Sequence, residues 1–270
     1  MHGLGNDFVV LDGRVSEISI SPAQAKAISD RRFGVGFDQL LIIRPAVQPG
    51  ADVFMEILNA DGSAAEACGN GTRCVAALMM DESGNDTVKI ETVAGVLPAT
   101  RNDDGLVNVD MGPAGLQWSD IPLATASDTL HLDVESGPLR DPVGVNIGNP
   151  HAVFFVDDAE AVDIDTLGPQ LETHAMFPER ANIEVVSKLG PDKLRMRVWE
   201  RAVGITSACG SGACAVGVAA FRRGLISRRS EIVLDGGSLF IEWREDGHVL
   251  MAGPTATAFH GALDASLMAV

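Results

Sequence analysis

The sequence has few basic residues, few cysteines and no long hydrophobic run, and each shortage argues against a class of protein. Its 270 residues include 20 Lys and Arg against 37 Asp and Glu, which gives a formal net charge of −17. An acidic surface repels nucleic-acid phosphates and anionic membranes, so we expect neither as a partner. Net charge of this kind informs about solubility and association and says little about the reaction that a protein catalyses.

Apolar runs are too short to suggest a membrane span or a signal peptide. The longest, residues 213–221, contains Gly217 and falls short of the roughly 20 residues that span a bilayer. Near the start, residues 8–11 are too few for a signal-peptide core and are flanked by Asp7 and Asp12. We therefore expect a soluble, cytoplasmic protein.

Four cysteines are too few for a disulfide scaffold, so a special role for any of them would be catalytic or metal-binding. Cys68 and Cys74 are separated by five residues, and Cys209 and Cys214 by four, which is not the pattern of closely spaced zinc knuckles. A metal site is therefore not expected. A redox pair, a structural disulfide and two plain buried cysteines remain as alternatives to catalysis.

Frequent turn residues, 29 Gly and 13 Pro, separate short β-branched runs and predict a strand-rich protein. A helix is expected over residues 22–30, after Ser21 as N-cap, and two more begin near Gly71 and Gly212. Strands and helices do not alternate regularly, so α+β is favoured over a doubly wound parallel sheet. The expected strands are residues 9–11, 40–43, 107–109, 152–156, 183–186, 194–199 and 232–234.

An internal repeat indicates two structurally similar halves, related by a pseudo-two-fold axis. Three short motifs of the first half recur in the second at a nearly constant separation, whereas chance matches would scatter. The predicted domains are residues 1–113, on which the segment of about 254–270 can pack, and residues 114–253. The repeated pairs are Asn6 with Asn149 and Gln39 with Asn182, each 143 residues apart, and Cys68 with Cys209, 141 apart.

Each repeated cysteine lies in an Ala-Cys-Gly-x-Gly loop that precedes a run of small residues suited to a buried helix. The pattern places Cys68 and Cys209 at helix N-termini, where N–H groups and the helix dipole favour negative charge. We therefore expect a lowered thiol pKa at both. Cys74 and Cys214 do not share a helix face with them, so a packing role is expected for these two.

Two such helix starts facing each other would hold one carboxylate and place a thiol on each face of the adjacent carbon. Inverting a stereocentre needs a base on one face and an acid on the other, and N–H donors stabilise the enolate-like charge. The few lysines, such as Lys89 and Lys188, lack a context typical of an imine-forming cofactor. The residues thus point to a cofactor-independent amino-acid epimerase.

Together the motifs closely resemble the diaminopimelate epimerase family over nearly the whole chain. The resemblance implies an α+β fold of two pseudo-symmetric, strand-rich domains, each a mostly antiparallel curved sheet or barrel around a central helix. It implies interconversion of LL- and meso-2,6-diaminopimelate, for lysine and peptidoglycan precursors, without metal or organic cofactor, and a homodimer is a possible assembly. The motifs are residues 1–8, 36–39, 59–63, 67–73, 148–151, 200–201 and 208–212.

The resemblance also implies roles for single residues. Cys68 and Cys209 are the acid/base pair, Glu200 helps to hold the reacting ammonium, and Arg201 with the Asn side chains holds the distal end of the substrate. His151 supports the network around Asn149. The implied substrate-binding set is Asn6, Gln39, Asn59, Gly69, Asn70, Asn149, Asn182, Glu200, Arg201, Gly210 and Ser211.

Other interpretations remain open for this pattern. Asn6 and Asn149 follow Gly and could be turn residues, Glu200 with Arg201 a surface pair, and His151 a packing histidine. A proline racemase-like enzyme and a non-catalytic amino-acid-binding protein are the alternative functions.

The chain departs from the family pattern at two positions. Ile205 stands where Glu is common, which removes a carboxylate near the second cysteine. Ser211 stands where Thr is common and keeps the small hydroxyl side chain and the backbone N–H.

Overall fold

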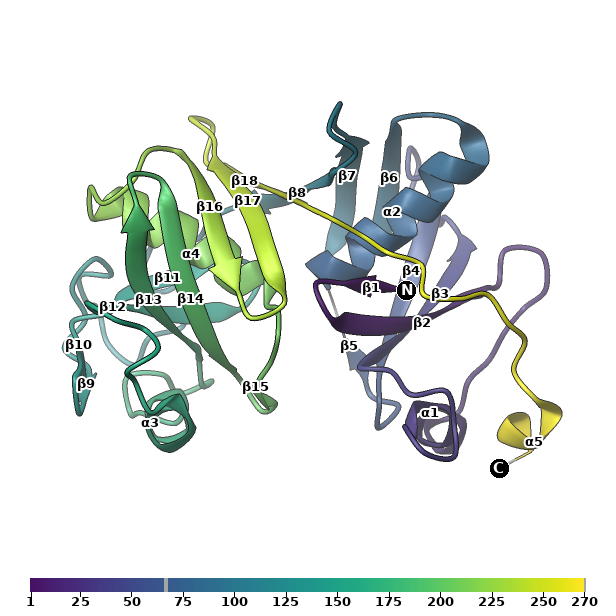
Figure 1. Ribbon diagram of the computed structural model, residues 1–270, viewed down its shortest axis with the longest axis horizontal. Coiled ribbons are helices and arrows are strands. Elements are labelled where there is room, and N and C mark those ends of the chain that lie inside the picture. The colour runs from purple at the N-terminus through teal and green to yellow at the C-terminus, as the bar shows by residue number, and fades with distance from the viewer. Residues whose placement is uncertain (66–67, 270) are drawn as a thin grey trace. The chain divides into compact units, whose positions relative to one another are not determined.

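The computed structural model describes residues 1–65 and 68–269 and divides into two compact units (Figure 1). The first comprises Met1–Val109 and Gly253–Val270, and the second comprises Asp110–Ala252. Ala67, the first residue of one predicted cysteine loop, lies outside the described residues. Within the described chain no helix is long and apolar enough to cross a membrane.

The first unit is a mixed sheet with helices packed against it. Its strands lie in the order β1, β2, β3, β4, β6, β7 and β8, and β5 pairs with β4. Neighbours are antiparallel except for β2–β3 and β4–β6. The elements are β1 (His2–Gly3), β2 (Asn6–Asp12), α1 (Pro22–Ser29), β3 (Gln39–Pro45), β4 (Val53–Asn59), β5 (Ala64–Ala65), α2 (Gly69–Ser83), β6 (Thr87–Thr92), β7 (Gly95–Arg101), β8 (Val107–Pro113) and α5 (Ala265–Met268).

The second unit has the strand order β11, β12, β13, β14, β16, β17 and β18, with β15 paired to β14. Its parallel pairs are β12–β13 and β14–β16, and β9 and β10 form a separate antiparallel pair. The elements are β9 (Glu135–Ser136), β10 (Leu139–Arg140), β11 (Val143–Asn146), β12 (Pro150–Phe155), α3 (Ile164–Glu172), β13 (Asn182–Gly190), β14 (Lys193–Glu200), β15 (Gly204–Ile205), α4 (Gly210–Arg222), β16 (Arg229–Leu234), β17 (Gly237–Trp243) and β18 (His248–Gly253).

The two units therefore repeat one topology, strand by strand. Helix α2 precedes β6 as α4 precedes β16, and α1 separates β2 from β3 as α3 separates β12 from β13. The register repeats as well, because Phe8 lies opposite Gln39 in the first unit and His151 opposite Asn182 in the second. The predicted fold class, α+β with two similar strand-rich halves of mostly antiparallel sheet, is confirmed.

Helix α4 is central to its unit because its middle consists of small apolar side chains. Ala213 and Ala220 are fully buried, as are the apolar side chains between them, and the helix contacts β11, β12, β13, β14, β16 and β17. A Cβ at Gly217 would lie 2.8 Å from Ile241, so glycine permits the close approach to β17. Cys214 here and Cys74 in α2 are fully buried, which confirms their predicted packing role.

Helix α1 begins at the predicted position and anchors the C-terminal segment. Ser21 and Gln24 form a capping box, in which Gln24 N donates to Ser21 Oγ at 3.2 Å and Ser21 N donates to Gln24 Oε1 at 2.8 Å. Ile28 lies in a core cluster against which Leu267 packs, and Gln24 Nε2 donates to the carbonyl of Met268 at 2.8 Å. The segment after β18 runs to α5 beside α1 (Figure 1).

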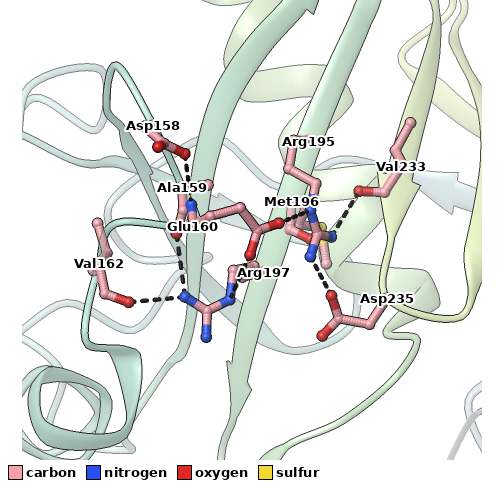
Figure 2. A network of polar contacts seen from close by, with 9 residues as sticks. All are labelled: Asp158, Ala159, Glu160, Val162, Arg195, Met196, Arg197, Val233 and Asp235. Carbon is pink, nitrogen blue, oxygen red and sulfur yellow. Dashed lines mark hydrogen bonds and ion pairs between the residues drawn. The ribbon is translucent and has the colours of Figure 1, made fainter.

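A polar network fixes the middle of β14 to its surroundings (Figure 2). Arg195 donates to Glu160 Oε1 at 2.6 Å and to the carbonyl of Val233 at 3.2 Å, and it also pairs with Asp235. Arg197, on the same face two residues on, donates to backbone carbonyls of the loop that carries Glu160. The two arginines therefore tie β14 to that loop and to the end of β16.

Candidate active site

The first cysteine motif forms the N-terminus of α2. Cys68 is the N-cap residue in extended conformation, with φ −150° and ψ 102°, and its Sγ accepts a hydrogen bond from Gly71 N at 3.3 Å. The residue is half-buried. Because the first N–H groups of a helix have no intrahelical acceptor, this sulfur lies at a site that favours an anion. The predicted position at a helix start is confirmed for Cys68.

Two linked amide side chains lie on one side of the Cys68 site, and one of them contacts the sulfur. Asn6 Oδ1 lies 4.0 Å from Cys68 Sγ and accepts from Asn70 Nδ2 at 3.1 Å. The amide of Asn70 is oriented in turn by Arg73, a fully buried residue whose Nη2 donates to Asn70 Oδ1 at 3.0 Å. The amide nitrogen of Asn6 donates to Asp38 Oδ2 at 2.9 Å. Charged groups at both ends thus orient the two amides, of which Asn6 contacts the thiol.

Gln39 and Asn59 form a second amide pair at the same end of the sheet. They lie opposite each other in the β3–β4 register, and Gln39 Nε2 donates to Asn59 Oδ1 at 3.0 Å. Asn59 Nδ2 donates to Ser63 Oγ at 3.0 Å. Since β2 and β3 begin where β4 ends, the fold gathers Asn6, Gln39 and Asn59 at one edge.

The second cysteine motif forms the N-terminus of α4. Cys209 is the N-cap, with φ −114° and ψ 110°, and is only 3% exposed. Its Sγ lies 3.7 Å from Ser211 Oγ. A Cβ at Gly212 would lie 3.2 Å from this sulfur and 2.9 Å from Glu184 Oε1, so the last glycine of the motif leaves no room for a side chain.

The expected lowering of the thiol pKa is wrong for Cys209. Burial raises its pKa well above the ordinary value, and the nearby carboxylates of Glu200 and Glu184 act in the same direction. The Gly212 backbone and the Ser211 side chain oppose this rise but act more weakly. The favourable helix N-terminus is therefore outweighed by desolvation and by two negative charges.

Glu200 lies at the end of β14 close to the second cysteine. Its carboxylate accepts a hydrogen bond from the hydroxyl of Thr206 and interacts with Cys209. Burial raises the pKa of Glu200, although these hydrogen bonds act in the opposite direction. Glu200 is therefore part of the Cys209 site and is not half of a surface ion pair.

His151 lies in the interior of the second unit, beside Glu184. Its Nδ1 is 2.6 Å from Glu184 Oε1, its Nε2 is 2.8 Å from Asn149 Oδ1, and both His151 and Glu184 are fully buried. The expected contact between His151 and Asn149 is present. The partner on the other side of the ring, Glu184, is not among the residues that the motifs predict.

The side chain of Asn182 holds the backbone of Arg201. Asn182 is 2% exposed, and its amide donates to the carbonyl of Pro150 at 2.9 Å and accepts from Arg201 N at 2.9 Å. The guanidinium of Arg201 donates to the carbonyl of Glu179 at 3.2 Å, in an exposed position. Asn182 therefore fixes the start of the turn that carries Arg201.

The sequence motifs assigned no role to two buried charged residues, Glu184 and Arg73. Each could have been noticed as a charged residue inside a run of apolar or small residues. Glu184 interrupts the buried run of β13, and Arg73 interrupts the small residues of α2. Ile205, by contrast, is 41% exposed on β15 opposite Trp199, so this departure from the family pattern places an apolar side chain at the surface. Over residues 1–65 and 68–269, no group of three or more His, Cys, Asp or Glu side chains could hold a metal ion.

Comparisons with known proteins agree over almost the whole chain. The family model described as diaminopimelate epimerase matches residues 1–117 and 143–257. A protein of that name from Rhodospirillum centenum is 60% identical over 99% of this chain and 92% of its own length. Another from Acidiphilium cryptum is 55% identical over 100% of this chain and 96% of its own length.

Solved structures share the fold at low identity. A probable proline racemase from Agrobacterium radiobacter has a TM-score of 0.67 at 18% identity, over 97% of this chain and 92% of that chain. A hydroxyproline epimerase from Agrobacterium vitis has a TM-score of 0.64 at 16% identity, over 96% and 89%. At this identity the likeness concerns the architecture alone.

Proposed function

This chain belongs to the diaminopimelate epimerase family, and we propose that it inverts one α-carbon of diaminopimelate with Cys68 and Cys209 as the acid/base pair. Eight curated relatives that bear this name are 45–60% identical over 97–100% of the chain. The chain is accordingly an isomerase that interconverts the LL and meso forms on the route to lysine. As an enzyme of amino-acid biosynthesis, it is proposed to work in the cytoplasm.

In the proposed mechanism the two sulfurs exchange protonation states during a turnover. One sulfur, as the thiolate, takes the α-proton and becomes a thiol, while the other, as the thiol, gives its proton to the opposite face of the carbon and becomes a thiolate. The electron pair left on carbon is delocalised into the carboxylate. N–H groups at the starts of α2 and α4 then stabilise the oxyanion charge, because they are preorganised where it develops.

The polar side chains around each sulfur supply the remaining binding groups of the proposal. The amides of Asn6 and Asn70 are already oriented beside Cys68, and Glu200 beside Cys209 offers a carboxylate for the reacting ammonium. Arg201 would hold the distal carboxylate, a pairing suited to guanidinium. The other proposed substrate-binding residues are Gln39, Asn59, Gly69, Asn149, Asn182, Gly210 and Ser211.

One observation carries the assignment of the two sulfurs. Cys68 and Cys209 are N-cap residues of topologically equivalent helices in two units of the same strand order. Buried cysteines that serve only packing, such as Cys74 and Cys214, occur within the helices instead. A duplicated site with a thiol at each helix start matches a reaction that needs two acid/base groups of the same kind.

Incubation of the enzyme with LL-diaminopimelate in D₂O tests the proposal. We expect the meso isomer to form and, in the first turnovers, deuterium to appear at the inverted α-carbon; NMR and mass spectrometry measure both. L-Proline, offered in parallel, should exchange no deuterium. Exchange into proline but not diaminopimelate would indicate a proline racemase-like enzyme, and exchange into neither would leave an amino-acid-binding protein.

A further inference from the structure

The two helix starts differ in the residue that lies directly beneath them. A Cβ at Gly71 would lie 3.1 Å from Leu41 Cδ1, and a Cβ at the equivalent Gly212 would lie 2.9 Å from Glu184 Oε1. Leu41 and Glu184 each follow by two residues the start of the corresponding strand, β3 or β13. The first unit therefore has an apolar side chain where the second has a buried carboxyl group.

The neighbouring strand differs in the same way, with the ionisable His151 in the second unit where the first unit has the apolar Phe8. His151 pairs with Asn182 in the register that places Phe8 opposite Gln39 in the first unit. The second unit thus replaces an apolar pair, Phe8 and Leu41, with a hydrogen-bonded pair of ionisable residues. Burial of such a pair is costly unless each polar atom is satisfied, so its presence calls for a reason beyond packing.

The Glu184 carboxylate is only partly satisfied by its surroundings. One oxygen contacts His151 Nδ1 at 2.6 Å, whereas Oε2 has no hydrogen-bond partner within the part of the chain that the structure describes. The side chain is fully buried, which leaves its charge poorly screened. A Cβ at Gly212 would lie 2.9 Å from Glu184 Oε1 and 3.2 Å from the Cys209 sulfur, so the carboxylate and the thiol border the same small space at the helix start.

The titratable groups around the Cys209 sulfur come from three strands packed against α4. Glu184 on β13 and Glu200 on β14 act on the sulfur directly, and His151 on β12 contacts Glu184. On α4 itself, Ser211 Oγ lies 3.7 Å from the sulfur, and β17 presents the apolar Ile241 further along the helix. Two of the three titratable groups are carboxyls, so their field opposes a negative charge on sulfur.

We propose that Glu184 is a positioning residue that keeps Cys209 protonated in the free enzyme and holds His151 against Asn149. Since Leu41 occupies the equivalent place beneath Cys68, the two sulfurs are inequivalent, and Cys209 enters the first turnover as the acid. Once Cys209 has given up its proton, its thiolate lies beside a buried carboxylate. That state is the less stable one and favours return of a proton to Cys209.

The inference rests on the proposed two-thiol function, but its test needs no substrate. Thiolate formation is followed by ultraviolet absorbance against pH, and Cys209 is isolated as the difference between a protein and its Cys209→Ser counterpart. With Glu184→Gln, which keeps the size of the side chain, the Cys209 titration should move to lower pH by about one unit or more, since a nearby like charge is removed.

A matched control is Glu172→Gln, because Glu172 is also a buried carboxylate of the second unit but is hydrogen-bonded to Trp199 and to the backbone of Ala202. It should leave the Cys209 titration unchanged. An unchanged titration in a folded Glu184→Gln variant would overturn the proposal, as would an equal shift in the control. If diaminopimelate proves not to be the substrate, these titrations still decide the role of Glu184.

The pH dependence of kcat gives a second test, because it would not change if Glu184 had only a structural role. In the direction in which Cys209 donates the proton, the alkaline limb of the kcat profile should move to lower pH in Glu184→Gln, in step with the titration. Should that variant not fold, the double variant His151→Phe with Glu184→Leu installs the apolar pair of the first unit, and its Cys209 should again titrate at lower pH. A titration equal to that of the unaltered protein would contradict the inference there too.

Discussion

At the scale of single residues, the two cysteines share a position in the backbone but have different surroundings. Both are N-cap residues, but Cys68 is half-buried among amides, whereas Cys209 is almost fully buried beside carboxyl groups. The Ala-Cys-Gly-x-Gly pattern predicts the first property, because it depends on a few neighbouring residues. It could not predict the second, because Glu184 and Glu200 reach Cys209 only through the pairing of β13 and β14.

Alanine in place of either proposed acid/base residue tests the mechanism at this scale. Cys68→Ala and Cys209→Ala should each lower kcat by about 100-fold or more, since general acid–base groups contribute factors of that size. Steady-state epimerisation of LL-diaminopimelate measures the loss. Circular dichroism should show an unchanged fold, and Cys214→Ala, a packing position, should keep kcat near that of the unaltered enzyme. Normal turnover without either sulfur would exclude the two-thiol mechanism.

At the scale of elements, short-range signals account for most of the correct predictions. Ser21 with Pro22 predicted α1, and the β-branched runs predicted strands that all lie within or overlap observed ones. Helix α3 was missed because Gly168 and Pro169 inside it indicate a break. Packing explains why the helix nevertheless contains Gly168. A Cβ there would lie 2.5 Å from the Trp199 ring, so the glycine lets the helix approach β14 closely.

The network of Arg195 gives a prediction about how β14 is held. Arg195→Ala removes charge-assisted bonds to Glu160 and Asp235 from a side chain that is 14% exposed, so unfolding should become easier by about 2 kcal/mol. Urea denaturation measures the change. Arg229→Ala is the control, because its pair with Glu242 is 79% exposed at the arginine, and it should change stability by only about 0.5 kcal/mol or less. Equal effects would mean that the network adds nothing to an ordinary surface pair.

At the scale of the whole molecule, the internal repeat was the most informative feature of the sequence. Separations of 143, 143 and 141 residues between paired motifs predicted a duplicated fold, and the strand order of the two units confirms it. Strand order itself was beyond the sequence, because parallel pairs such as β2–β3 and β4–β6 join segments that are distant along the chain.

Oxidation tests a requirement that the mechanism places on the whole molecule. If both sulfurs reach one α-carbon, mild oxidant should inactivate the enzyme by joining Cys68 to Cys209, and a thiol reductant should restore activity. Mass spectrometry of digested, unreduced protein identifies the joined peptides. A variant with Cys74→Ala and Cys214→Ala should respond in the same way, because those side chains are buried in the helices. Reversible inactivation without that linkage would count against the shared carbon.

The repeated topology also has a consequence for how such an enzyme can evolve. In a symmetric assembly of two identical chains, every substitution appears at both sites at once. Here the equivalent places are encoded separately, so position 41 can carry an apolar side chain while position 184 carries a carboxyl group. Duplication within one chain thus permits a division of labour between two copies of the same chemical group.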